Sequence, residues 1–176
     1  MSQSQGDATQ TTGRWMIYVA CVLFLAFGTW FFSAAIEDRR NPNQDIATRV
    51  EAGVREVTLE RNRQGHFVAS GTINGEPVTF MLDTGASDVS IPASVADRIG
   101  LERGAQVRYN TANGVVNAYR TRLDEVGIGD IRVRDIRGSI NPHVQFDQVL
   151  LGNSFLEEVE FTQTRQKLIL RQAASR

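Results

Sequence analysis

An aspartate stands directly after an apolar run in the segment FMLDTGASDVSIP, residues 80–92. The preceding PVTFML is rich in β-branched and apolar residues, so Asp83 is expected where a strand leaves its sheet. Thr84 and Gly85 follow at once, and a glycine permits a tight turn that a threonine hydroxyl can lock. An aspartate in such a turn either caps the turn or takes part in chemistry. Taken alone, Asp83 is more typical of a cap.

Amide hydrolysis gives this aspartate a chemical use. Two carboxylates about 3 Å apart cannot both ionise, so they share one proton and activate a water between them, one as base and the other as acid. The sequence has a single Asp-Thr-Gly, at Asp83, so a working pair requires a second copy from another chain. Ala86 is small and leaves room for substrate and partner. A catalytic Asp83 is therefore also a prediction of a homodimer.

The elements that must position Asp83 are short strands separated by turn signals. Strands are predicted over 55–61, 66–73, 76–82, both arms of a hairpin within 105–129, 131–140, 147–151 and a last hairpin within 158–171, with a short helix over 92–99. Asn74-Gly75 and Asn113-Gly114 are strong hairpin signals. The pattern predicts one mainly β, mainly antiparallel domain over 54–172.

The N-terminal part differs in composition from this domain. Residues 1–14 read as a disordered polar tail, and 15–36 contains 22 residues without a charge, enough for a single transmembrane helix. A cleaved signal peptide ending near residues 33–35 is the alternative. Residues 37–53 read as a linker whose second half forms a short helix. More arginines follow the apolar run than precede it, which favours a cytoplasmic C-terminus. Long domains translocate largely regardless of charge, however, so charge does not decide on which side of the membrane the domain lies.

Composition excludes several classes of protein. The 176 residues carry a net charge of -1 with a pI near 6.1, and the basic residues are scattered, so no nucleic-acid partner is expected. Cys21 is the single cysteine, which rules out an intrachain disulfide and zinc-type Cys spacing. His66 and His143 lie far apart and read as strand or loop residues. We therefore expect no metal and no cofactor.

Two motifs together resemble a known family. FMLDTGAS resembles the active-site motif of aspartic proteases of the pepsin and retropepsin superfamily, and VLLGNSF at 149–155 resembles their second signature, which passes behind the active-site loop. The spacing of the two motifs is like that of retropepsins (clan AA), most of all the bacterial membrane-anchored type, over residues 55–171. The resemblance implies a single-lobed closed β-barrel or sandwich with one or two short helices, and a homodimer.

The resemblance also implies roles for individual residues. Asp83 is the expected catalytic carboxylate, Thr84 bonds across the dimer axis, and Gly85 offers its backbone to the substrate. The residues expected to contact substrate, the last four in a flap hairpin, are Ala86, Ser87, Thr111, Ala112, Asn113 and Gly114. Ala86 stands where pepsins have a hydroxyl, and Ser87 where retroviral enzymes have an aspartate, so contacts to the substrate backbone are expected to differ.

Two functions are compatible with these residues. The first is a membrane-anchored, homodimeric aspartic endopeptidase that cuts extended segments of peptide or protein substrates. The second is a non-catalytic module that binds an extended peptide on the same fold. An intact Asp-Thr-Gly favours the peptidase, because a binding module has no need of a carboxylate on the dimer axis. The resemblance to bacterial envelope enzymes favours the inner membrane, with the catalytic domain in the periplasm.

Overall fold

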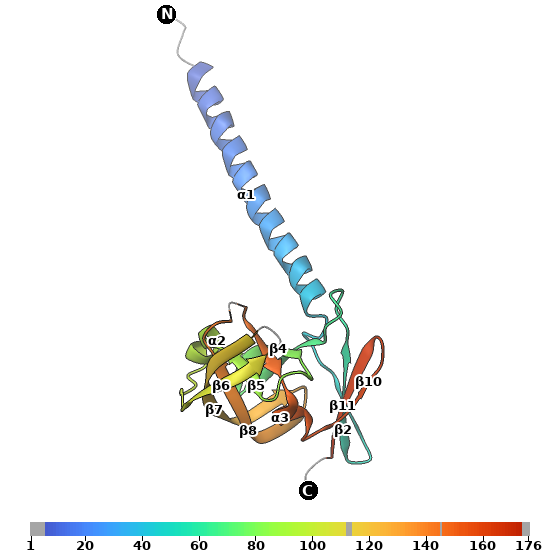
Figure 1. The fold of residues 1–176 in the computed structure, drawn as a ribbon. Helices are drawn as coiled ribbons and strands as arrows, with labels where there is room; N and C mark the ends of the chain where they lie inside the picture. The colour runs from blue at the N-terminus through green and yellow to red at the C-terminus, as the bar shows by residue number, and fades with distance from the viewer. Residues whose placement is uncertain (1–5, 112–113, 145, 174–176) are drawn as a thin grey trace, which may run out of the picture. The chain divides into compact units, whose positions relative to one another are not determined.

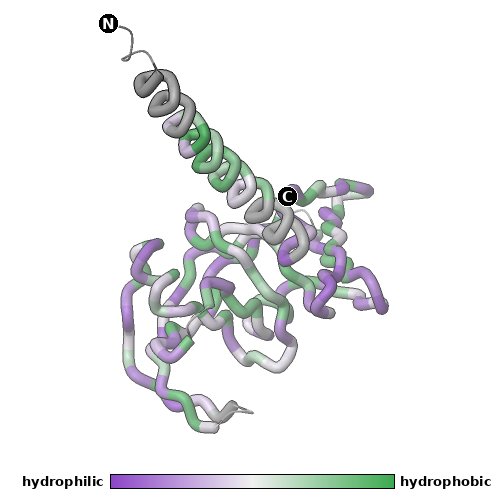
Figure 2. Tube along the Cα trace, turned by 90° about the horizontal axis from the view of Figure 1, so that it is seen from above, coloured by the Kyte–Doolittle hydropathy of each residue, from purple (hydrophilic) through white to green (hydrophobic). Residues whose placement is uncertain are grey.

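The computed structural model describes residues 6–111, 114–144 and 146–173, within two compact units, Met1–Arg39 and Arg40–Arg176. The described part of the first unit is helical and belongs to α1, whose bounds are Gly6–Arg40. The helix thus begins inside the segment predicted to be a disordered tail and continues past residue 36. Its middle is hydrophobic (Figure 2), and large side chains such as Trp15, Phe24 and Trp30 are exposed along it.

The membrane-spanning helix predicted over 15–36 is not found. Among the described residues no helix is long and apolar enough to cross a bilayer.

In its described residues the second unit contains two sheets and two short helices (Figure 1). The smaller sheet has the strand order β1 (Thr48–Glu51), β2 (Val54–Glu60), β11 (Lys167–Ala173) and β10 (Glu160–Gln163). The larger sheet has the order β3 (Val68–Ile73), β4 (Glu76–Leu82), β9 (Gln148–Leu151), β5 (Val89–Pro92), β8 (Ile131–Asn141), β7 (Gly114–Ile128) and β6 (Gln106–Thr111). The helices are α2 (Ala93–Arg98) and α3 (Asn153–Leu156). Because β7 also pairs with β3, the larger sheet closes into a barrel. The predicted mainly β, closed architecture is confirmed.

Alternation along the strands explains the core. Val57 and Leu59 in β2, and Val78 and Phe80 in β4, point inward and are almost fully buried, while the residues between them are more exposed. The β3–β4 hairpin turns at Asn74 (φ 52°) and Gly75 (φ 86°), both left-handed, as a two-residue turn that matches strand twist requires.

The strand order places β9 between β4 and β5. The other strand pairs are antiparallel, as the sequence pattern predicted, but β9 runs parallel to β4 and β5 runs parallel to β8, which was not predicted. Local periodicity reports which residues face the core but not which distant strand lies alongside. The consequence is that Leu82, the last residue of β4, lies beside Leu151, the last residue of β9. The segments that follow, starting at Asp83 and at Gly152, therefore meet.

Part of the predicted linker over 37–53 belongs to the folded domain. The buried side chain of Asn43 donates to the carbonyl oxygens of Glu60 at 2.9 Å and Val68 at 2.6 Å, and its Oδ1 accepts the Glu60 N–H at 2.7 Å. Strand β1 stands where a short helix was predicted. A single asparagine that satisfies three backbone groups of two strands gives no periodic signal, which is why composition alone suggested a linker.

Candidate active site

Asp83 begins a tight turn directly after β4. Its backbone N–H donates to the Leu151 carbonyl at 3.2 Å, and its own carbonyl accepts the Ala86 N–H at 3.1 Å. The carboxylate Oδ1 accepts the Gly85 N–H at 2.9 Å. A Cβ at Gly85 would lie 3.1 Å from that same oxygen, so a glycine keeps the carboxylate uncrowded. The turn holds Asp83 half-buried, with one oxygen oriented by the backbone.

The segment after β9 forms the floor beneath this turn. A Cβ on Gly152 would lie 2.6 Å from the Ala86 carbonyl oxygen and 2.3 Å from that of Asp88, so a side chain there has no space. The Asn153 N–H donates to the Ala86 carbonyl at 2.8 Å, and the Ser154 N–H to the Ser87 carbonyl at 3.0 Å. The second motif therefore fixes the loop that carries Asp83, as the resemblance implied.

Ser154 adds a side-chain connection that was not predicted. Its buried hydroxyl donates to the Arg137 carbonyl on β8 at 2.8 Å and accepts the Val89 N–H at the start of β5 at 3.1 Å. One hydroxyl thus joins the end of the active-site loop to two strands of the barrel. Its position in the NSF of the second motif was the signal that could have identified it.

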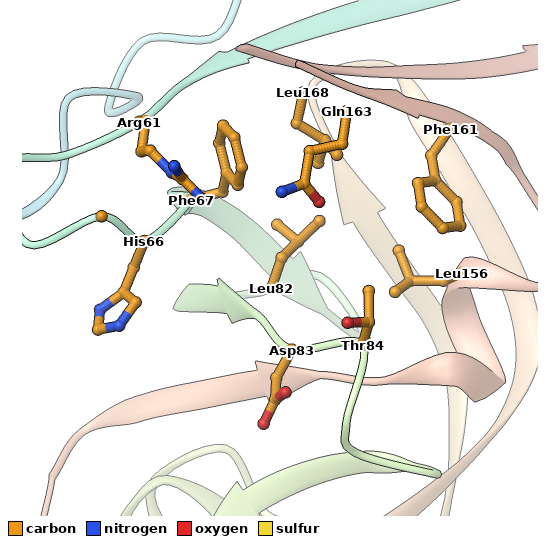
Figure 3. Close-up of a pocket in the computed structure, with 11 residues that line it drawn as sticks. Arg61, His66, Phe67, Leu82, Asp83, Thr84, Leu156, Phe161, Gln163 and Leu168 are labelled. Atoms are coloured by element: carbon orange, nitrogen blue, oxygen red, sulfur yellow. The ribbon is translucent and has the colours of Figure 1, made fainter. Parts of the chain in front are cut away.

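A pocket of about 150 Å³ opens beside the turn (Figure 3). Asp83 and Thr84 line it together with residues that are mostly apolar or cationic, namely Arg61, Gly65, His66, Phe67, Leu82, Leu156, Phe161, Gln163 and Leu168. In Figure 3 the Thr84 side chain points toward Leu156 and Phe161, whereas the Asp83 carboxylate points away from them. The pocket therefore joins the catalytic candidate to an apolar surface. No role was predicted for His66, which the fold brings into this pocket.

The structure describes some of the predicted substrate-contacting residues. Ser87 is exposed and Ala86 half-buried in the same loop as Asp83. Thr111 ends β6 and Gly114, with φ 110°, begins β7, so the predicted hairpin forms. Ala112 and Asn113 lie outside the described residues. The role of this hairpin as a flap stays a prediction.

A tyrosine from the hairpin reaches the active-site loop. The Tyr109 hydroxyl on β6 donates to Asp88 Oδ2 at 2.8 Å, and Arg137 Nε lies 3.7 Å from Asp88 Oδ1. Burial raises the pKa of Tyr109 above its ordinary value of 10.0, and the hydrogen bond and charge of Asp88 raise it further, while Ser139 and Arg120 oppose the shift. Tyr109 thus remains a neutral donor at neutral pH. This hydrogen bond between Tyr109 and Asp88 was not predicted.

Known proteins resemble this chain in sequence, and a solved structure resembles it in fold. The chain is 36% identical over 116 residues to an uncharacterised protein encoded 5′ of cobV in a Sinorhizobium species, covering 64% of this chain and 50% of that protein. It is 33% identical over 108 residues to an uncharacterised protein of Rickettsia prowazekii (strain Madrid E), covering 59% and 46%. The chain thus spans about half the length of these curated relatives. A crystal structure of a retropepsin-like aspartic protease from Rickettsia conorii matches with a TM-score of 0.57 and 32% identity, over 72% of this chain and 95% of that one.

The closed barrel, the Asp-Thr-Gly turn and its glycine floor define a retropepsin-like aspartic protease fold. The chain belongs to the family of gag-polyprotein putative aspartyl proteases. The family model matches residues 69–158, just over half of this chain.

Proposed function

We propose that this chain is an aspartic endopeptidase whose active site forms when two chains place their Asp83 carboxylates side by side. The observation that carries the proposal is the turn itself. Asp83 is half-buried, one of its oxygens is oriented by the Gly85 N–H, and the loop is fixed from below by Gly152. This rigidity suits a catalytic group, because hydrolysis depends on accurate placement of the reacting atoms.

The chemistry needs only the two carboxylates and a water. The ionised Asp83 takes a proton from the water as the water oxygen attacks the peptide carbonyl, and the protonated Asp83 of the second chain donates its proton to the carbonyl oxygen. The C–N bond breaks as the leaving nitrogen takes the proton that the first Asp83 received from water, and a hydroxyl of the tetrahedral species returns its proton to the second Asp83 as the new carbonyl forms. The pair ends with one shared proton, ready for another cycle.

A test of this function uses the full chain and a library of extended peptides. Cleavage at internal peptide bonds is expected, and a transition-state analogue directed at aspartic proteases is expected to abolish it, because such analogues bind far more tightly than substrates. A metal chelator is expected to leave the rate unchanged. Activity that the chelator removes and the analogue does not would contradict the proposal.

The surface beside Asp83 supports assembly with a second copy. Leu82 and Phe161 line the pocket together with Thr84, and Phe161 on β10 is 43% exposed. All four residues of β10 are exposed, and in the described strand order β10 is the last strand of its sheet. Covering this apolar surface with a second chain brings a second Asp83 toward the first, since a two-fold dimer uses the same patch on both copies.

Phe161→Glu tests this assembly. Each dimer contains two copies of the substitution, and burying a phenylalanine is worth about 1.5–3 kcal/mol, so the dimer dissociation constant is expected to rise about 100-fold or more. Activity per chain is expected to fall accordingly on dilution. Analytical ultracentrifugation of the full chain over a concentration series measures the constant.

Phe146→Glu is the matched control for this variant. Phe146 is 46% exposed, nearly the same as Phe161, but it does not line the pocket. The control is expected to leave the dissociation constant unchanged. Equal dimer constants for Phe161→Glu and the unmodified chain would show that the dimer, if it forms, uses another surface.

The location in the cell stays a prediction. The resemblance to bacterial envelope enzymes favours the inner membrane, with the domain in the periplasm. A reporter fused after Arg176 that functions in only one compartment, combined with an alkaline wash of isolated membranes, tests the side and the attachment separately. A signal from a reporter that works only in the cytoplasm would contradict the periplasmic location.

A further inference from the structure

The contact between Tyr109 and Asp88 joins two parts of the domain that the sheet does not connect directly. Asp88 lies in the active-site loop, five residues after Asp83, and its side chain is 18% exposed. Tyr109 lies on β6, which ends the described order of the larger sheet and pairs there with β7. The hydroxyl-to-carboxylate bond of 2.8 Å is therefore a direct tie between the β6–β7 hairpin and the loop.

The loop end of this tie is held firmly. Gly152 leaves no space beneath the Asp88 carbonyl, and the Ser154 hydroxyl accepts the Val89 N–H at 3.1 Å. Arg137 on β8 adds a charge on the other oxygen of Asp88. Because the loop is fixed on several sides, the bond positions the hairpin relative to the loop rather than the loop relative to the hairpin.

We propose that Tyr109 is a positioning residue of the peptidase, whose hydroxyl, bound to Asp88, holds the β6–β7 hairpin in place beside the Asp83 loop. The inference rests on the proposed function for its consequence on substrate. An extended peptide that binds between the hairpin and the loop then finds both sides already ordered, which lowers the entropic cost of binding. Loss of the bond is expected to weaken substrate binding more than it slows the chemical step.

Charge around the hydroxyl predicts a pH dependence. Asp88 from the loop, Arg120 from β7 and Ser139 from β8 act on the Tyr109 hydroxyl, and Arg137 from β8 lies 3.7 Å from Asp88. Since the folded pKa of Tyr109 lies above its ordinary value of 10.0, the tie is fully present below pH 10 and is lost as the pH rises through the raised value. The tie is therefore expected to be intact near neutral pH, where the variants are compared.

The test compares Tyr109→Phe with Tyr119→Phe, the same change at a half-buried tyrosine on the other strand of the hairpin. Tyr109→Phe is expected to raise KM roughly tenfold with kcat nearly unchanged, as loss of one hydrogen bond to a charged group predicts. Tyr119→Phe is expected to leave KM unchanged.

The variants of Asp88 test the other end of the bond. Asp88→Ala is expected to raise KM as much as Tyr109→Phe does. Asp88→Asn keeps an oxygen that accepts the same bond, so its KM is expected to stay close to that of the unmodified chain. The double variant Tyr109→Phe/Asp88→Ala should be no worse than either single change.

Hydrogen exchange of the β6 amides gives a readout that does not depend on catalysis. Tyr109→Phe is expected to speed their exchange severalfold at neutral pH, and Asp88→Asn is expected to leave it nearly unchanged. Unchanged exchange together with unchanged KM in Tyr109→Phe would overturn the inference. If the full chain cleaves no peptide, the proposed function fails, and the exchange comparison alone decides whether Tyr109 positions the hairpin.

Discussion

Asp83→Asn is expected to lower kcat/KM of the full chain for peptide hydrolysis by about 10⁴-fold or more, because it removes both the base and the shared proton. The amide is nearly the same size as the carboxylate, and its oxygen can still accept the Gly85 N–H that the Asp83 carboxylate accepts at 2.9 Å. The fold, the dimer and peptide binding are therefore expected to survive. Steady-state kinetics with an internally quenched peptide measure the loss.

Asp88→Asn is the matched control, since it makes the same chemical change five residues along the same loop. It is expected to change kcat/KM by less than about threefold, because the bond from Tyr109 has an oxygen to accept it in either form. A folded, dimeric Asp83→Asn protein that cleaved peptides at the unmodified rate would falsify the catalytic role. Peptide binding without cleavage by the unmodified chain would instead favour the binding module.

Gly152→Ala is expected to have the second largest effect, although Gly152 lies 69 positions from Asp83 in the sequence. Its φ of -92° and ψ of -170° suit any residue, so backbone strain is not the cause. The added Cβ would lie 2.3 Å from the Asp88 carbonyl oxygen and 2.6 Å from that of Ala86, and backbone atoms cannot rotate away. Either the loop or the β9–α3 junction must shift, displacing Asp83.

The expected cost is about 3 kcal/mol in the free energy of unfolding, with a fall of about 100-fold in kcat/KM if the loop is what moves. Chemical denaturation and peptide kinetics of the same preparation measure both. Gly28→Ala in α1 is the control, since no other group lies within 4 Å of a Cβ built there. A Gly152→Ala protein with unmodified stability and rate would show that the close approach to the loop is not a constraint.

Local signals predicted the position of the candidate catalytic turn well. The apolar run before Asp83, the Asn74-Gly75 turn and the short helix after Pro92 all appear within a few residues of their predicted places. Each depends on residues that are near one another in the sequence, such as a left-handed glycine or a strand that alternates. The contact between the Asp83 loop and the segment 149–155 was also predicted, because the resemblance to the protease family placed that segment behind the loop.

Features that depend on distant residues were not predicted. The insertion of β9 between β4 and β5 and the burial of Asn43 against β2 and β3 join segments far apart in the chain. The Tyr109–Asp88 bond joins residues 21 positions apart on different elements. A local irregularity was also missed. In β8 the buried residues Val133 and Ile136 are three positions apart instead of two, because Asp135 between them has a left-handed backbone with φ 61°. Periodicity carries no information on such contacts.

A mixing experiment tests the two-chain active site most directly. Unmodified chain and Asp83→Asn chain are exchanged at a fixed total concentration well above the dimer dissociation constant, and hydrolysis is measured against the unmodified fraction. If two Asp83 carboxylates are required, activity follows the square of that fraction, so an equal mixture retains about one quarter of the full rate. Activity that falls in proportion to the fraction, to about one half in the equal mixture, would show that one chain is sufficient.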